Sequence, residues 1–162
     1  MNKTKNRIFS WLPVIFWMLI IFLFSSQPAS DSDGFSRGFT SILIDIIGRI
    51  LPIDVVTSTG ADLIAKYNHI VRKLAHFTVY LILSILVANA LESSKKEFNY
   101  KMFLYSLLIC VLYAISDEFH QLFVSGRGCQ IKDVLIDSMG SFIGLVIYFA
   151  VKSFYKKIKN YN

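Results

Sequence analysis

The sequence predicts an all-α integral membrane protein with four transmembrane helices plus an amphipathic helix on the outer face. Hydrophobic residues make up 54% of the 162-residue chain and charged residues only 17%, a balance unlike that of a small soluble domain. The apolar residues form four runs. Each run reaches, alone or with a polar extension, the roughly 17–25 residues that cross a bilayer. A soluble bundle of four such helices would lack a polar face.

The four runs contain few charged residues. The runs are Ile8–Phe24 with no charge, Leu74–Leu91 with none apart from His76, Met102–Ser116 with none before it extends through Val124, and Val134–Val151 with Asp137 alone. Basic residues precede the first run, as they precede the apolar region of a signal peptide. The sequence after it offers no convincing cleavage site, and Pro28 disfavours one, so we interpret the run as a retained anchor.

A fifth helix is predicted between the first two spans. Its apolar residues recur at helical spacing, and they are Phe35, Phe39, Ile42, Leu43, Ile46, Ile47, Ile50 and Leu51. Asp45 and Arg49 make this stretch a poor span, so we expect it to lie in the outer interface or to cap the bundle. Pro52 should end the helix. After it, Ala61–Leu91 should form one uninterrupted helix that starts in polar surroundings and then enters the bilayer.

The basic residues predict the orientation of the chain in the cell membrane. Ten of the 17 lie in three short segments, before the first span, between the second and third, and after the fourth. Such residues stay in the cytoplasm, so both termini should be cytoplasmic, with Ser25–Asn68 and Ser125–Lys132 outside. A net charge of +6 could suggest a nucleic-acid partner, but the placement of the basic residues at the ends of the spans argues against one. Cys110 and Cys129 lie at depths too different for a disulfide.

This topology gathers ionisable residues at one level of the outer leaflet. Three separate parts of the sequence contribute, and the residues are Arg72, Lys73 and His76 from the second span, Asp117, Glu118, His120 and Gln121 from the third, Asp133 and Asp137 from the fourth, and Arg127 from the connecting loop. Polar groups at the end of a membrane span are costly and usually mark function.

Spacing places several of these residues on common helix faces. His69, Arg72 and His76 share one face, and Asp133 and Asp137 share another, with Asp137 about one turn deeper. His69 is expected to be a polar residue of the interface rather than a member of the site. Gly140 and Gly144 form a G-x-x-x-G pattern that favours close helix packing.

Two interpretations of the cluster remain open. Four basic and four acidic side chains are present, so they can pair into a structural network. A functional site is favoured, because buried ion pairs contribute little to stability. The residues that would do proton transfer or orient a ligand are His76, His120, Asp133, Asp137 and Glu118. Those that would bind the substrate are Arg72, Lys73, Asp117, Gln121 and Arg127. No metal or cofactor is expected, since no zinc-type motif is present.

The motifs together resemble the VanZ-like family of small bacterial membrane proteins. The resemblance rests on Ser25-Ser26-Gln27-Pro28, Arg72-Lys73-x-x-His76-Phe77-x-x-Tyr80, Asp117-Glu118-x-His120-Gln121-x-Phe123-x-x-Gly126-Arg127 and Asp133-Val134-x-x-Asp137-x-x-Gly140-x-x-x-Gly144. It covers almost the whole chain, which we interpret as one domain over residues 1–162. The resemblance implies four membrane helices and a link to teicoplanin-type glycopeptide tolerance, without naming a reaction.

We therefore hypothesise a bacterial cell-envelope protein whose polar site acts on or holds the head group of a lipid or cell-wall precursor. Its partners would be membrane lipids and a lipid-linked precursor or glycopeptide. The alternative is a non-enzymatic protein that limits antibiotic access by binding the drug or remodelling the surface. A transporter is a weaker idea, because the inner halves of the spans are almost free of ionisable residues.

Overall fold

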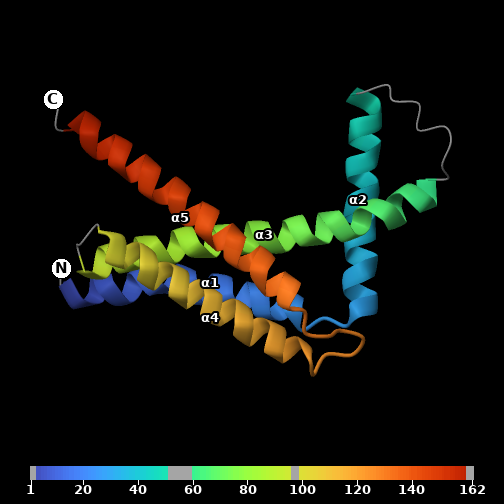
Figure 1. The fold of residues 1–162 in the computed structure, drawn as a ribbon, viewed down its shortest axis with the longest axis horizontal. Helices are drawn as coiled ribbons and strands as arrows, with labels where there is room; N and C mark the ends of the chain where they lie inside the picture. Colours follow the sequence, from blue (N-terminus) through green and yellow to red (C-terminus); the bar gives the residue numbers. More distant parts are fainter. Residues whose placement is uncertain (1–2, 51–59, 96–98, 160–162) are drawn as a thin grey trace.

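The computed structural model describes residues 3–50, 60–95 and 99–159, and these residues form five α-helices without a strand among them (Figure 1). The helices are α1 (Lys3–Ser25), α2 (Ala29–Ile50), α3 (Gly60–Lys95), α4 (Tyr100–Gln121) and α5 (Ile131–Lys159). All except α2 are long and apolar enough to cross a membrane. The prediction of an all-α membrane protein with four spans and one further helix is confirmed.

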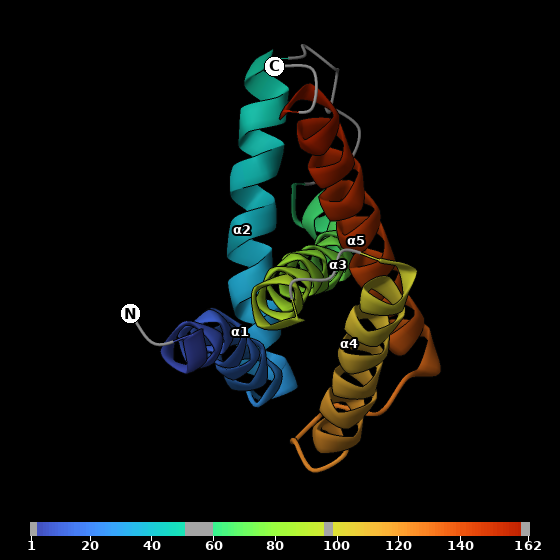
Figure 2. The same cartoon turned by 90° about the vertical axis from the view of Figure 1, so that its left-hand side faces the viewer.

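The central element of the bundle is α3, which contacts each of the other four helices. Seen along the bundle in Figure 2, α1 lies on one side of α3, and α4 and α5 lie on the other. Tyr80, Leu83 and Val87 of α3 are fully buried in the core. Large apolar side chains on the outer surfaces of α1, α4 and α5 remain exposed, as expected of helices that face lipid.

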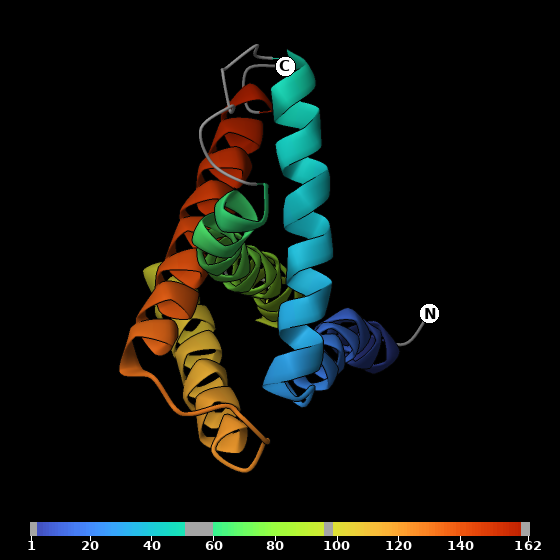
Figure 3. The same cartoon turned by 90° about the vertical axis from the view of Figure 1, so that its right-hand side faces the viewer.

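Helix α2 runs across the other helices rather than along them (Figures 1 and 3). Its polar side chains attach it to the start of α3, where the Asn68 amide donates to Asp33 at 2.6 Å and the Thr40 hydroxyl donates to Asn68 at 3.4 Å. Phe35 and Phe39 of the predicted apolar stripe are exposed. Leu51 and the expected helix stop at Pro52 lie outside the described residues.

The two ends of the bundle differ in chemistry. One end, called the polar end below, comprises the α1–α2 turn, residues 69–76 of α3, residues 117–121 of α4, the loop 122–130 and residues 133–137 of α5. At the opposite end α1 starts, α3 ends, α4 starts and α5 ends (Figure 1). There Glu92 accepts a hydrogen bond from Tyr148 and pairs with Lys152 at 3.0 Å. Both cysteines are free, Cys110 buried in α4 and Cys129 exposed in the loop.

Candidate functional site

Two glycines of α5 set the position of the site relative to α3. A Cβ atom at Gly140 would lie 2.3 Å from the backbone oxygen of Phe77, and one at Gly144 would lie 2.4 Å from that of Leu81. The helices can approach this closely only because both positions lack a side chain. Asp137 lies one turn before Gly140 on the same face of α5. The close approach therefore brings its carboxylate to His76, the neighbour of Phe77.

His76 and Asp137 form the centre of the site. The His76 Nδ1 atom lies 3.7 Å from the Asp137 Oδ1 atom, which is an ion-pair separation but too long for a hydrogen bond. The Asp137 side chain is 0% exposed, and neither of its oxygens has a hydrogen-bond partner among the described residues. A carboxylate buried in this way is costly unless something pairs with it. Because Asp137 faces Nδ1, the Nε2 atom of His76 is the nitrogen left for a ligand.

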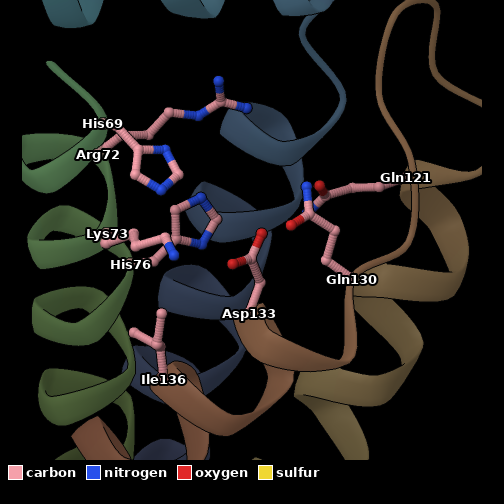
Figure 4. A pocket seen from close by; sticks show the side chains of 8 residues that line it. All are labelled: His69, Arg72, Lys73, His76, Gln121, Gln130, Asp133 and Ile136. Atoms are coloured by element: carbon pink, nitrogen blue, oxygen red, sulfur yellow. The ribbon is translucent and has the colours of Figure 1, made fainter. Parts of the chain in front are cut away.

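A polar cavity of about 90 Å³ adjoins this pair (Figure 4). Several α3 residues line it, among them Arg72 and His76 of the predicted shared face, and the full set is His69, Arg72, Lys73, His76, Gln121, Gln130, Asp133 and Ile136. The side chains of His76 and Asp133 point toward one another across it. The volume accommodates a few waters or one small polar group. His69, which the sequence led us to expect outside the site, also lines the cavity. Gln130 was not singled out from the sequence because a lone loop glutamine carries no signal.

Asp117 and Tyr80 extend the polar region deeper into the bundle. Asp117 is 3% exposed and accepts a hydrogen bond from Gln121 at 3.2 Å through one oxygen. The hydroxyl of Tyr80 is buried without a partner among the described residues, and it interacts electrostatically with Asp117 and Asp137. Tyr80 was not among the predicted site residues. Its position four residues after His76, on the same helix face, is the signal that would have found it.

Glu118 has a local structural partner. One of its carboxylate oxygens accepts the backbone N–H of Gln130 at 2.9 Å. The carbonyl of Gln130 in turn accepts from Asp133 N at 2.9 Å, so Gln130 caps the start of α5. A carboxylate at a helix N-terminus is favourable. Glu118 therefore holds the loop against α5, and its role in proton transfer remains a prediction.

His120 and Arg127 face the α1–α2 turn instead of the polar cavity. His120 Nε2 lies 3.2 Å from the Ser26 hydroxyl, and its ring packs on Phe22 with centroids 4.6 Å apart. Arg127 donates to the backbone oxygen of Phe24 at 3.3 Å. Burial, together with the nearby Arg72 guanidinium, lowers the pKa of Arg127 below its usual value. The loop positions Arg127 through Gly126, whose φ of 73° favours glycine.

Few of the charges at the polar end form direct ion pairs with one another. Among the described residues, Arg72, Lys73, Arg127 and Lys132 form no ion pair with Asp117, Glu118, Asp133 or Asp137, and the pair His76–Asp137 is the one ion-pair contact recorded within the cluster. In a network that served only to hold the helices together, we would expect the charged side chains to pair with one another. This arrangement favours a ligand-binding role.

No group of three or more His, Cys, Asp or Glu side chains is placed to hold a metal ion in the part of the chain that the structure describes. The chemistry available is that of an oriented histidine beside buried carboxylates, with two guanidinium groups that can bind an anion in bidentate fashion.

Comparison with protein-family models identifies the family of this chain. The family model described as VanZ/LLP1 matches residues 9–152, which includes every residue of the polar end. No curated protein and no solved structure matches the chain.

Proposed function

The chain belongs to the VanZ/LLP1 family, and from this premise and its four membrane-length helices we propose that its polar site binds and acts on an anionic head group of a lipid or lipid-linked cell-wall precursor. The site would face the outer leaflet of the bacterial cell membrane, because the basic residues gather at the opposite ends of the spans. The resemblance to VanZ-like proteins adds a cellular readout, tolerance of teicoplanin-type glycopeptides.

The observation that carries the proposal is the buried Asp137 carboxylate facing His76. It has no other partner among the described residues, and it adjoins a cavity lined by the cations Arg72 and Lys73 together with the Asp133 carboxylate. Arg72 and Lys73 would bind the anion of the head group. His76, held beside Asp137, would accept a proton through Nε2 from a hydroxyl of the head group.

The test compares Asp137→Asn and His76→Gln with the unaltered chain in a teicoplanin-sensitive bacterial host. We expect both variants to reduce tolerance to that of cells without the gene, while the membrane abundance of the protein stays near normal. The lipids and muropeptides of the same cells should return to the pattern of cells without the gene. Asp45→Asn is the matched control, because Asp45 is exposed on α2, away from the site.

The outcomes separate three roles. Full tolerance in well-expressed variants at both His76 and Asp137 would contradict a functional site. A loss of tolerance that merely follows a loss of abundance would indicate a structural role. Should His76→Gln keep its tolerance while Arg72→Gln loses it, the site would bind without proton transfer, as a non-enzymatic envelope protein would.

A further inference from the structure

A second cavity of about 280 Å³ lies beside the polar cavity, between α1, α2 and α3. It is called the apolar groove below, and its apolar walls include Ile21, Phe24, Phe39, Val71, Ala75 and Val79. Phe35 and Phe39, which border it on α2, are 72% and 53% exposed, so the groove is open on the side of α2. It is larger than the roughly 150 Å³ aliphatic cavities that bind benzene.

The apolar groove and the polar cavity share a wall. Arg72 and His76 line both of them, and Arg127 lines the groove. The groove is thus apolar along its length and cationic where it meets the polar cavity. Neither arginine forms a direct ion pair with a carboxylate among the described residues, and the two guanidinium groups repel one another. An anion between them would relieve that repulsion.

These features match one kind of ligand. A hydrocarbon chain in the groove is stabilised by contact with the apolar walls, and a phosphate is stabilised by hydrogen bonds from two bidentate guanidinium groups. A soluble phosphate would leave the groove unused. A glycopeptide is too large and too polar for it. The exposed apolar surfaces of α1 and α2 beside the groove suit entry from the surrounding bilayer.

We propose that the apolar groove binds the hydrocarbon chain of a membrane lipid whose phosphate head group lies between Arg72 and Arg127, beside His76. This inference rests on the proposed function, since it names the substrate class of the same site. It adds that the substrate carries its own tail and reaches the site from within the membrane.

The experiment measures binding of phosphatidylglycerol and of glycerol 3-phosphate to the purified full-length chain in detergent. Ala75→Phe fills the groove without removing a charge. We expect it to weaken phosphatidylglycerol binding at least about tenfold, which corresponds to about 1.4 kcal/mol. Glycerol 3-phosphate should bind it and the unaltered chain equally weakly. Ala150→Phe, at an exposed position of α5 far from the groove, is the matched control and should bind like the unaltered chain.

A second pair of variants guards against misfolding of Ala75→Phe. Phe39→Asp places a charge at the edge of the groove, and Ile46→Asp places one on the same exposed face of α2 outside the groove. Phe39→Asp should weaken lipid binding, and Ile46→Asp should not.

The results distinguish the two proposals. Suppose that Arg72→Gln and Arg127→Gln no longer bind phosphatidylglycerol, whereas Ala75→Phe and Phe39→Asp bind it normally. The head-group site would then stand, and the groove inference would be wrong. If the arginine variants bind both ligands like the unaltered chain, the proposed function itself fails.

Discussion

Several buried polar atoms around His76 form no hydrogen bond among the described residues. They include the hydroxyls of Ser25 and Tyr80, one oxygen each of Asp117 and Glu118, and both oxygens of Asp137. Buried polar groups in native proteins are nearly always hydrogen-bonded, and each exception needs an explanation. Elsewhere in the same bundle the hydroxyls of Tyr113 and Ser141 are bonded to backbone oxygens. The contrast indicates that the polar groups at His76 serve a ligand rather than packing.

Tyr80 allows this interpretation to be tested at a single hydroxyl. Tyr80→Phe removes a buried, unpartnered hydroxyl, so the melting temperature in detergent should stay the same or rise. If the hydroxyl serves the site, glycopeptide tolerance should fall.

The matched control for this change is Tyr113→Phe. It removes a hydroxyl that donates to the backbone oxygen of Met18 at 2.6 Å, so it should cost about 0.5–1.5 kcal/mol of stability. A Tyr80→Phe protein that melts earlier than Tyr113→Phe and keeps its tolerance would assign Tyr80 to packing alone.

At the level of the helices, the contact between α3 and α5 connects packing to the site. The backbones meet at Gly140 and Gly144, and Ser141 between them donates to the carbonyl of Tyr80 at 3.4 Å. Asp137 and His76 lie at the end of this same contact. A displacement of α5 would therefore change the His76–Asp137 separation directly.

The prediction at this scale is that Gly140→Ala separates α5 from α3. The Cβ of the new alanine would meet backbone atoms of Phe77, which cannot move aside as a side chain would. We therefore expect the free energy of unfolding to fall by about 1–3 kcal/mol. The measurement is unfolding in detergent, with tolerance as the second readout.

Gly34→Ala on α2 is the matched control for this loss. A Cβ there meets nothing within 4 Å, and alanine favours a helix, so stability should stay equal or increase by about 0.5–1 kcal/mol. Equal stability of the Gly140→Ala and Gly34→Ala proteins would show that the close contact is not needed.

At the scale of the whole molecule, the positions of the two chain termini agree with four membrane crossings. The start of α1 and the end of α5 lie at the same end of the bundle, opposite the loop that carries Cys129 (Figure 1). Four spans require both termini to lie on one side of the membrane. The basic residues of the opposite end predict that this side is the cytoplasm.

Labelling in intact cells tests this orientation. A membrane-impermeant maleimide should react with the exposed Cys129 of the unaltered chain. It should not react with a chain that carries Cys129→Ser and Asn160→Cys until the cells are opened. Cys110 is buried and should stay unlabelled in both. The reverse pattern would place the polar end in the cytoplasm and exclude an outer-leaflet substrate.

The sequence alone predicts the helices and the residues that gather at the polar end. Apolar run length identifies four spans, and a stripe of apolar residues at helical spacing identifies α2, because both patterns follow from the geometry of a single helix. The shared face of His69, Arg72 and His76 is equally local, and these residues do line one cavity. Family membership is also readable from the motifs, since the VanZ/LLP1 match covers residues 9–152.

Only the tertiary structure shows which partner each of these residues has. It places Asp137 at His76, turns His120 toward Ser26, assigns Glu118 to the start of α5 and adds Tyr80 to the buried polar region. It also opens the apolar groove beside Arg72. Spacing fixes the face of a helix on which a side chain lies, whereas its partner depends on how far and at what angle the next helix approaches. In this protein that approach is set at Gly140 and Gly144, by contacts between residues more than fifty positions apart.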